Sequence, residues 1–313
     1  MKLVIFAYHN IGYICIKELL KQKANIAAIF THKDSKDENI WFKSVEKLAR
    51  QKGIPVFTPS SKEIKSKVFF NKLKRLKPDI IFSFYYRYLL PQSILDIPPY
   101  GAFNLHGSYL PEYRGRCPVN WVIINGEKST GVTLHYMEKK ADSGDIVAQK
   151  RVPISFKDTA LTLFRKMEKT AAELIRKTYP KIIEGKIKRI PQDTKKASYY
   201  GGRNPEDGKI EWDNSKESIY NLIRAVTHPY PGAFTYLNGE KLYVWKAQIS
   251  KRKNRLNDLK AGTIVKVFPK RGMLVKTGNG YLLLKEVQLE NVKTLKEARL
   301  FKKFKKYEGL ELK

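Results

Sequence analysis

The sequence places an amide, an imidazole and a carboxylate where they can serve one pocket. Asn104 and His106 are two residues apart in the run 101–108, which is expected to be the end of a buried strand. Side chains at positions i and i+2 of a strand project from the same face. Asp142 follows the next strand-like run, 130–137, so its loop can return to that face. These residue types suit the transfer of an acyl group to an amine.

Acyl transfer to an amine assigns a task to each of these side chains. The amine attacks the carbonyl carbon, and the adduct carries negative charge on oxygen and positive charge on nitrogen. The side-chain N–H of Asn104 can stabilise the oxygen, and losing such a donor typically raises the barrier by about 3 kcal/mol. His106 can accept the proton from nitrogen if its ring is held in the right tautomer. Asp142 can orient that ring or help to remove the proton, directly or through a water. The alternative for the Asn-X-His pair alone is that it satisfies its own backbone.

Longer segments around these residues resemble the 10-formyltetrahydrofolate-dependent formyltransferases. The segments are FNLHGSYLPEYRGRCPVNW from Phe103, DSGDIVAQ from Asp142, the opening KLVIFAYHNIG, FSFYYRYLLP from Phe82, TGVTLHYM from Thr130, and IEWDNS and RAVTHPYPGAF between 210 and 234. The branch that the chain resembles most is the UDP-4-amino-4-deoxy-L-arabinose formyltransferase, a sugar-nucleotide enzyme. Methionyl-tRNA formyltransferase is a better-known relative. The resemblance implies that Asn104, His106 and Asp142 are the catalytic set.

By the same resemblance the formyl donor is 10-formyltetrahydrofolate, and no metal is expected. The flat pterin of a folate has several hydrogen-bonding edges, and the backbone of an irregular loop suits such a ligand. The resemblance assigns the donor site to the segment after the expected strand 79–85, with Asp142 and its loop closing from the other side. The donor-binding residues are therefore expected to be Tyr85, Tyr86, Arg87, Tyr88, Leu89 and Asp142. We expect Phe82 and Phe84 to be core residues, and Tyr86 to line the site.

Residues for the acceptor amine are expected just past the catalytic strand and in the second half of the chain. Arg114 and Arg116 follow that strand, and guanidinium groups match phosphates well. Asn120 begins a helix whose amino end favours an anion. By resemblance, the loop with Tyr230 helps to frame the acceptor, and His9 belongs to the AYHN sequence of the sugar-nucleotide branch. In contrast, His32, His135 and Cys117 show no clear chemistry, and we interpret them as structural.

Three functions compete. The leading hypothesis is formyl transfer to the amine of an amino-sugar nucleotide, because FAYHNIG, HGSYLP and RGRCPVNW resemble that branch. The second is methionyl-tRNA formyltransferase, which the high pI favours. However, the tRNA enzymes carry a longer basic loop where this chain has THKDSKDENIWF, which is short and of mixed charge, and a tRNA site needs positive potential in a defined place. The third is a non-catalytic RNA-binding protein on the same fold, which the intact set of Asn104, His106 and Asp142 disfavours.

Composition limits the class of protein. The 313 residues suffice for one large domain and a smaller one. Lys+Arg number 61 against 30 Asp+Glu, a formal net charge of +31. Such a surface attracts phosphates, but the lysines are spread along the chain, as in a lysine-biased proteome. No apolar run approaches the roughly 18 to 20 residues of a membrane span, and the opening KLVIFA is too short for a signal peptide. Cys15 and Cys117 have neither metal-ligand nor disulfide spacing. We therefore expect a cytoplasmic protein.

The elements that must position these residues follow an α/β pattern. Short apolar runs alternate with helix-like stretches in the first half, which predicts a Rossmann-like open, mostly parallel sheet with helices on both faces. Strands are expected at 2–7, 26–31, 55–58 and 79–85, and helices at 11–21, 41–51, 62–76, 118–125 and 161–185. The first strand–helix turn, AYHNIG, is not a GxGxxG, which argues against a dinucleotide site.

The chain is predicted to divide into a catalytic domain at 1–190, a polar linker at 191–208 and a C-terminal domain at 209–313. Short strands expected at 233–237, 241–245, 262–268, 272–277 and 281–289 indicate a small β-barrel, and the resemblance implies an OB-like domain. OB folds often bind nucleic acid, but the fold alone does not show that this one does. We expect Leu300, Phe301 and Phe304 of the basic C-terminal stretch to pack on the body of the protein.

Overall fold

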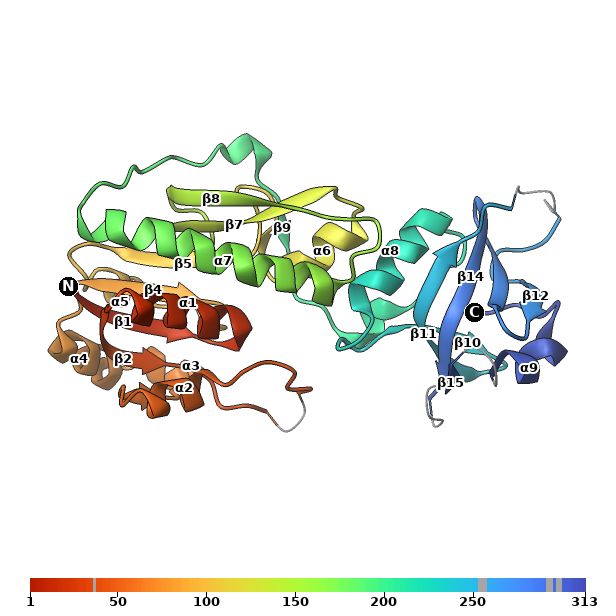
Figure 1. Ribbon diagram of the computed structural model, residues 1–313, viewed down its shortest axis with the longest axis horizontal. Helices are drawn as coiled ribbons and strands as arrows, with labels where there is room; N and C mark the ends of the chain where they lie inside the picture. Colours follow the sequence, from red (N-terminus) through yellow and green to blue (C-terminus); the bar gives the residue numbers. More distant parts are fainter. Residues whose placement is uncertain (36–37, 253–257, 291–294, 297–299) are drawn as a thin grey trace. The chain divides into compact units, whose positions relative to one another are not determined.

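The computed structural model describes residues 1–35, 38–252, 258–290, 295–296 and 300–313 (Figure 1). The chain forms two compact units. The first contains residues 1–118, 129–153 and 164–201, and the second contains residues 119–128, 154–163 and 202–313. These units differ from the predicted domains. Residues 191–201 of the predicted linker belong to the first unit, and two short segments of the predicted catalytic domain belong to the second.

A seven-stranded sheet forms the centre of the first unit, in the order β3-β2-β1-β4-β5-β7-β8 (Figure 1). The strands are β1 (Lys2–Ala7), β2 (Asn25–Phe30), β3 (Val56–Phe57), β4 (Ile80–Phe84), β5 (Ala102–His106), β7 (Ser129–Tyr136) and β8 (Ile146–Pro153). The strands from β3 to β5 pair in parallel, whereas β7 and β8 are antiparallel to their neighbours. The mostly parallel open sheet is therefore confirmed. Nearly every residue of β1 and β4 is buried, as expected for parallel strands that helices cover on both sides.

Helices cover both faces of this sheet. On one face, α3 (Ser61–Ile64), α4 (Lys67–Leu76) and α5 (Gln92–Leu95) pack through apolar side chains such as Leu73 onto Phe6 and its neighbours. The other face carries α1 (His9–Lys21) and α7 (Ala160–Ile183), where the rings of Phe82 and Tyr179 are 6.4 Å apart. The short helix α2 (Val45–Gln51) packs on α1.

The predicted helix 62–76 is two helices, because serine side chains cap both of them. Ser60 and Glu63 form a capping box at the start of α3, in which each side chain accepts the other's backbone N–H. The side chain of Ser66 accepts the backbone N–H of Phe69 at 3.2 Å and begins α4. A serine in this role has non-helical backbone angles and interrupts a continuous helix.

The second unit contains an antiparallel sheet in the order β10-β11-β14-β13-β12. The strands of this sheet are β10 (Ala233–Leu237), β11 (Glu240–Ile249), β12 (Ile264–Phe268), β13 (Gly272–Thr277) and β14 (Gly280–Leu289), and β15 (Leu295–Lys296) pairs with β14. The second unit also contains the helices α8 (Lys216–Val226), α9 (Leu300–Phe304) and, apart from its first residue, α6 (Pro118–Ile124). The end of the chain joins the two outer strands. Lys313 exchanges backbone hydrogen bonds with Tyr236 of β10, and the N–H of Leu312 donates to Gly262 just before β12. These bonds close the sheet into the small barrel that was predicted.

The basic C-terminal stretch packs on the second unit through its aromatic residues. Phe301 and Phe304 are buried, as predicted, whereas the side chain of Leu300 lies outside the described residues. Among the residues that the structure describes, no helix has the length and apolar character needed to cross a membrane.

Candidate active site

Asn104, His106 and Asp142 meet on one face of the first unit's sheet. Strand β5 presents Asn104 and His106, and the loop between β7 and β8 brings Asp142 back to them. The Nδ2 of Asn104 donates to Asp142 Oδ1 at 3.3 Å, and Nδ1 of His106 lies 3.5 Å from the same oxygen. The second carboxylate oxygen accepts the backbone N–H of Gly115 at 2.9 Å. The three side chains thus form one cluster, in which the carboxylate is only 10% exposed.

The environment of Asp142 keeps its carboxylate ionised. Burial alone would raise the pKa of Asp142, but the neighbouring imidazoles of His106 and His135 and the N–H of Gly115 outweigh burial and hold this pKa well below its usual range. The backbone of Asp142 has a φ of 56°, in the left-handed region. A non-glycine residue there is strained, and such strain is concentrated at functional sites.

The tautomer of His106 follows from its partners. The Nε2 of His106 lies 2.8 Å from the backbone oxygen of Tyr113. Because a carbonyl oxygen only accepts hydrogen bonds, Nε2 carries the hydrogen and donates it. In the neutral ring, Nδ1 then holds a lone pair beside Asp142. A proton taken up at Nδ1 would lie between the ring and the carboxylate, which is the arrangement of a general base whose charged form is stabilised.

His135 is a member of this cluster that the sequence did not reveal. It is the direct cross-strand partner of Asn104 between β5 and β7, so both side chains share a face. Its Nδ1 donates to the backbone oxygen of Tyr136 at 2.7 Å, which leaves Nε2 to accept from Asn104 Nδ2 at 3.2 Å. His135, which the sequence led us to interpret as structural, therefore contacts both Asn104 and Asp142. The contact arises from the pairing of β5 with β7, which no spacing in the sequence indicates.

The donors on Asn104 are fully engaged in this structure. An amide NH2 has two hydrogens, and here one is directed at Asp142 and the other at His135. The contact with Asp142 is the longer of the two. Asn104 can therefore offer an N–H to a substrate oxygen only by exchanging one of these contacts.

The residues predicted to bind the donor follow β4 as a segment without helix or strand structure, 85–90. Tyr85 begins it with a left-handed φ of 57°. Its hydroxyl lies 2.1 Å from where a Cβ on Gly107 would be, so a larger residue directly after His106 would have to displace the Tyr85 ring. The side chain of Tyr86, which was predicted to line the site, is half-buried. It packs on Phe6, with ring centroids 5.2 Å apart, and stacks on His32 at 4.2 Å.

The rest of this segment reaches the surface. The backbone N–H of Arg87 donates to His32 Nε2 at 3.0 Å, so His32 holds the shape of the segment. The guanidinium of Arg87 forms an ion pair with Glu38. Tyr88 is partly exposed and Leu89 is 71% exposed. The segment therefore combines an anchored backbone with accessible side chains at its tip.

Arg114 does not have the place predicted for an acceptor-binding residue. Its side chain is only 2% exposed. The Nε and Nη2 atoms donate to Gln192 Oε1 at 3.1 and 2.6 Å, and Nη1 donates to the hydroxyl of Tyr199 at 2.9 Å. The guanidinium is thus used inside the first unit and is not available to a phosphate. Arg116, two residues further on, is exposed.

Two other predicted acceptor residues are also engaged in packing. His9 lies among aromatic rings, with centroids 4.1 Å from Phe42 and 4.7 Å from Phe164. Burial, helped by the charge of Arg87, lowers the pKa of His9 to about 3, so this ring is neutral and cannot form an ion pair with a phosphate near pH 7. The Nδ2 of Asn120 donates to the backbone oxygen of Ala225 at 2.8 Å.

Asn120 and the remaining predicted residue, Tyr230, belong to the second unit. In that unit, the backbone N–H of Tyr230 donates to the oxygen of Thr227 at 3.1 Å. The predicted site residues are therefore divided between the two units.

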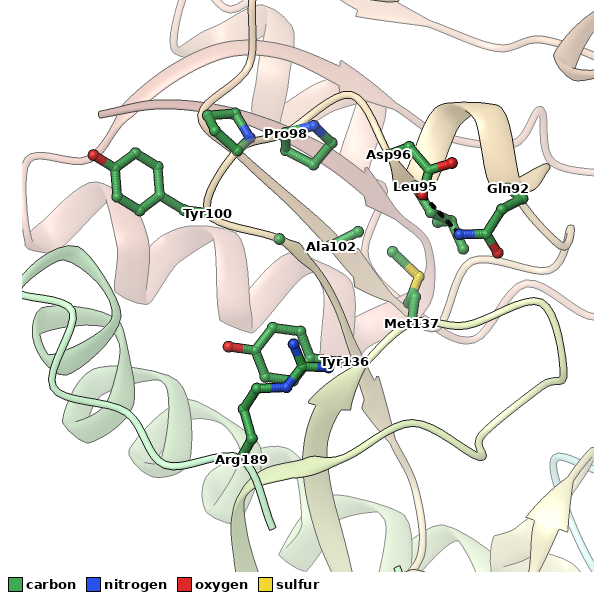
Figure 2. A pocket seen from close by; sticks show the side chains of 11 residues that line it. Gln92, Leu95, Asp96, Pro98, Tyr100, Ala102, Tyr136, Met137 and Arg189 are labelled. Atoms are coloured by element: carbon green, nitrogen blue, oxygen red, sulfur yellow. Dashed lines mark hydrogen bonds between the residues drawn. The ribbon is translucent and has the colours of Figure 1, made fainter. Parts of the chain in front are cut away.

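A shallow depression of about 280 Å³ lies elsewhere on the first unit (Figure 2). Its lining includes Tyr100, Tyr136 and Arg189, with the guanidinium of Arg189 4.1 Å from the Tyr136 ring centroid. Ala102 in its wall is the first residue of β5, whereas His106 is the last. We place the active site at the His106 end, because that is where the acid–base groups gather. Among the described residues, no cluster of three or more His, Cys, Asp or Glu could hold a metal ion.

Comparison with known proteins adds a family and a fold. Residues 1–179 match the family model described as formyl transferase, and residues 203–305 match formyl transferase, C-terminal domain. A similar solved structure is the N-formyltransferase from Helicobacter canadensis in complex with folinic acid and dTDP-3-aminofucose. Its TM-score is 0.70 at 22% identity, over 91% of this chain and 98% of that one.

Two further structures share this fold. One is WlaRD, a sugar 3N-formyl transferase determined with dTDP and 5-N-formyl-THF, with a TM-score of 0.70 and 22% identity over 93% of this chain and 98% of that one. The other is methionyl-tRNA formyltransferase from Clostridium thermocellum, with a TM-score of 0.56 and 18% identity over 80% of this chain and 94% of that one. At these identities the likeness establishes the fold.

Proposed function

The chain belongs to the formyl transferase family, and on this premise we propose that it transfers a formyl group from 10-formyltetrahydrofolate to the primary amine of an amino-sugar nucleotide. The observation that carries the proposal is the convergence of Asn104, His106 and Asp142 on one face of β5. A donor for a developing oxyanion, a base and a carboxylate beside that base are what formyl transfer to an amine requires.

The residues around β4 fit a folate donor. The backbone of segment 85–90 leaves the sheet ladder directly after Phe84 and is anchored by His32. Backbone amides and carbonyls in such a segment can meet the polar edges of a pterin at fixed positions. We assign the pterin to this backbone, beside Asp142, and the more exposed part of the folate to the side chains of Tyr88 and Leu89. When bound, the donor supplies the formyl carbon.

His106 acts as the base at a defined atom. Nε2 stays committed to the backbone oxygen of Tyr113, so the proton of the amine is taken up at Nδ1. When the tetrahedral adduct collapses, the bond between the formyl carbon and N10 of the folate breaks, and the proton held at Nδ1 passes to that nitrogen, which leaves as tetrahydrofolate. The resulting imidazolium lies beside the ionised carboxylate of Asp142, 3.5 Å away. Asp142 thereby stabilises the charge that His106 acquires, and its contact with the N–H of Gly115 keeps the carboxylate in place.

Asn104 acts as the donor to the formyl oxygen. It exchanges its 3.3 Å contact with Asp142 for that oxygen and keeps its 3.2 Å contact with His135. The retained contact fixes the amide, so that the released N–H is already oriented. Preorganised donors of this kind are among the largest contributions to acyl-transfer catalysis.

An amino-sugar nucleotide is the acceptor class that the observations support best. The two sugar formyltransferases match the fold of this chain with TM-scores of 0.70, and the tRNA enzyme with 0.56. Exposed Arg116, beside β6 (Arg114–Gly115), suits the diphosphate of such an acceptor. From the sequence resemblance, the specific acceptor that we propose is UDP-4-amino-4-deoxy-L-arabinose.

A turnover assay with three acceptors tests this proposal. The protein and 10-formyltetrahydrofolate are incubated with UDP-4-amino-4-deoxy-L-arabinose, a dTDP-linked 3-amino sugar or methionyl-tRNA, and the products are identified by mass spectrometry. We expect formylation of an amino sugar. Formylation of the dTDP-linked sugar alone would correct the specific acceptor, and formylation of tRNA alone would overturn the acceptor class. If no amine is formylated, a non-catalytic RNA-binding function becomes the better account.

A further inference from the structure

We propose that Gln192 is a positioning residue for Asp142, an inference that rests on the proposed formyl transfer. The Nε2 of Gln192 donates to the backbone oxygens of Asp142 at 2.9 Å and Gly144 at 2.7 Å. Its Oε1 accepts two hydrogen bonds from the Arg114 guanidinium, one from Nε and one from Nη2. All the polar groups of this amide are therefore used, and they connect the loop of Asp142 to strand β6.

The contacts form a closed ring of four residues. Gln192 holds the backbone of Asp142, the carboxylate of Asp142 accepts the N–H of Gly115, and Gly115 is the direct neighbour of Arg114, which Gln192 also binds. Removing the side chain of Gln192, Asp142 or Arg114 breaks this ring of contacts. The backbone and the carboxylate of Asp142 are thus fixed from the same two segments of the chain.

Asp142 needs such support because of its backbone. The left-handed conformation at its φ of 56° is strained for a non-glycine residue. A strained residue keeps this conformation only where its surroundings hold it. The bond from Gln192 to the carbonyl of Asp142 acts directly on the strained peptide unit.

Gln192 is itself held by the chain on both sides. Ile190 exchanges two backbone hydrogen bonds with Ile146, at 2.8 and 3.0 Å. Further along, β9 (Tyr199–Tyr200) pairs in parallel with β6. Segment 190–200, which the sequence presented as a linker, therefore braces the catalytic loop.

The residue just before this segment supplies a control. Arg189 binds the same loop, at Asp145, through an ion pair of 3.0 Å, and its ring contact is visible in Figure 2. Its side chain is 58% exposed, and exposed ion pairs contribute little to stability. Arg189 thus contacts the loop without touching the peptide unit of Asp142.

Two substitutions of Gln192 separate its tasks. Gln192→Glu keeps oxygens toward Arg114 but places an oxygen against the two backbone carbonyls, and Gln192→Met keeps the length of the side chain without polar groups. We expect both to lower kcat by about 10- to 100-fold, because a displacement of about 1 Å can cost a factor of 100. The KM values for donor and acceptor should stay within about threefold, because Gln192 acts on the reacting groups rather than on binding.

Arg189→Gln and Gln51→Glu, the latter at an exposed position, should retain wild-type kcat. Wild-type kcat in both Gln192 variants would overturn the inference, as would an equal loss in Arg189→Gln. Should Gln192→Glu fail to fold in circular dichroism, Gln192→Met supplies the same comparison without a buried charge.

A double-mutant cycle identifies Asp142 as the residue through which Gln192 acts. In the background of Asp142→Asn, adding Gln192→Met should lower kcat by less than about twofold, because the two changes disable the same group. If Gln192 had a purely structural effect, its fold-loss of kcat would multiply with the fold-loss caused by Asp142→Asn. Fold-losses that multiply in this way would contradict the inference.

Hydrogen exchange provides a readout that does not depend on activity. The N–H of Gly115 should exchange faster in Gln192→Met than in wild type, because its acceptor is the carboxylate of Asp142. Unchanged exchange at Gly115 would contradict the inference. If wild-type protein formylates no amine, the proposed function fails, and this measurement still decides whether Gln192 holds Asp142.

Discussion

His135 and Asn104 face each other across β5 and β7, with 3.2 Å between Nε2 of the ring and Nδ2 of the amide. Because His135 Nδ1 is committed to the backbone oxygen of Tyr136, Nε2 is the only ring atom that can accept from Asn104. This pairing directs the NH2 group, rather than the carbonyl oxygen, of Asn104 toward the carboxylate of Asp142. The amide that we propose as donor to the formyl oxygen is thus oriented by a histidine on the neighbouring strand.

Replacement of His135 should therefore affect turnover through Asn104. We expect His135→Leu to lower kcat by about 10- to 100-fold, because the amide loses the acceptor that fixes its orientation. His135→Gln should retain more activity, since its side-chain oxygen can accept from Asn104. The kcat of both variants and the KM for the donor are measured together. Equal activity of the Leu and Gln variants would rule out this role.

His106→Ala should lower kcat by about 10²- to 10⁴-fold, which is the range for loss of a positioned general base. Binding of the folate donor, measured by calorimetry, should change little, because the residues assigned to the pterin follow β4. Near-normal turnover in this variant would exclude His106 as the base.

The two arginines beside β6 should behave differently. Arg116→Ala should raise the KM for the acceptor by about tenfold, since a hydrogen bond to a charged group contributes about 1.5 kcal/mol or more. Arg114→Met should instead lower kcat, because Arg114 is buried against Gln192. Steady-state kinetics with varied acceptor separate the two effects. A raised acceptor KM in Arg114→Met with kcat unchanged would contradict the buried placement.

Stability should fall as the pH drops from 7 to 5. Burial, aided by the charge of Arg87, lowers the pKa of His9 to about 3 and that of His32 to about 4. The same side chains in the unfolded chain have pKa values of about 6.5. Between these pKa values the unfolded state binds more protons than the folded state. The contribution of these two neutral rings to the free energy of unfolding is therefore fully present above about pH 6.5, and it is lost as the pH falls toward their pKa values in the folded protein.

Urea unfolding of wild type and His9→Phe at pH 7 and pH 5 measures this effect. The midpoint of wild type should fall at pH 5, and that of His9→Phe should fall less, because the phenylalanine fills the aromatic site without a proton to bind. His228→Phe, at an exposed histidine, should follow wild type. Identical shifts in His9→Phe and wild type would show that His9 does not contribute to the pH dependence.

The sequence by itself determined the sheet of this protein and the convergence of Asn104, His106 and Asp142. Strands such as β1 and β4 are continuous apolar runs, and the spacing of Asn104 and His106 follows from the strand period, which is a local property. The placement of Asp142 also followed, because a loop after a neighbouring strand has few other places to go.

Only the tertiary structure decided which side chains support that chemistry. His135 meets Asn104 through strand pairing, and Gln192 meets Arg114 across 78 positions of sequence. A spacing pattern carries no information on such contacts, so His135 and segment 190–200 gave no signal of their role. The fate of Arg114 was undecided for the same reason. A guanidinium near an active site can bind a ligand or hydrogen-bond within the fold. Here the distant residue Gln192 accepts its hydrogen bonds, so Arg114 is part of the fold.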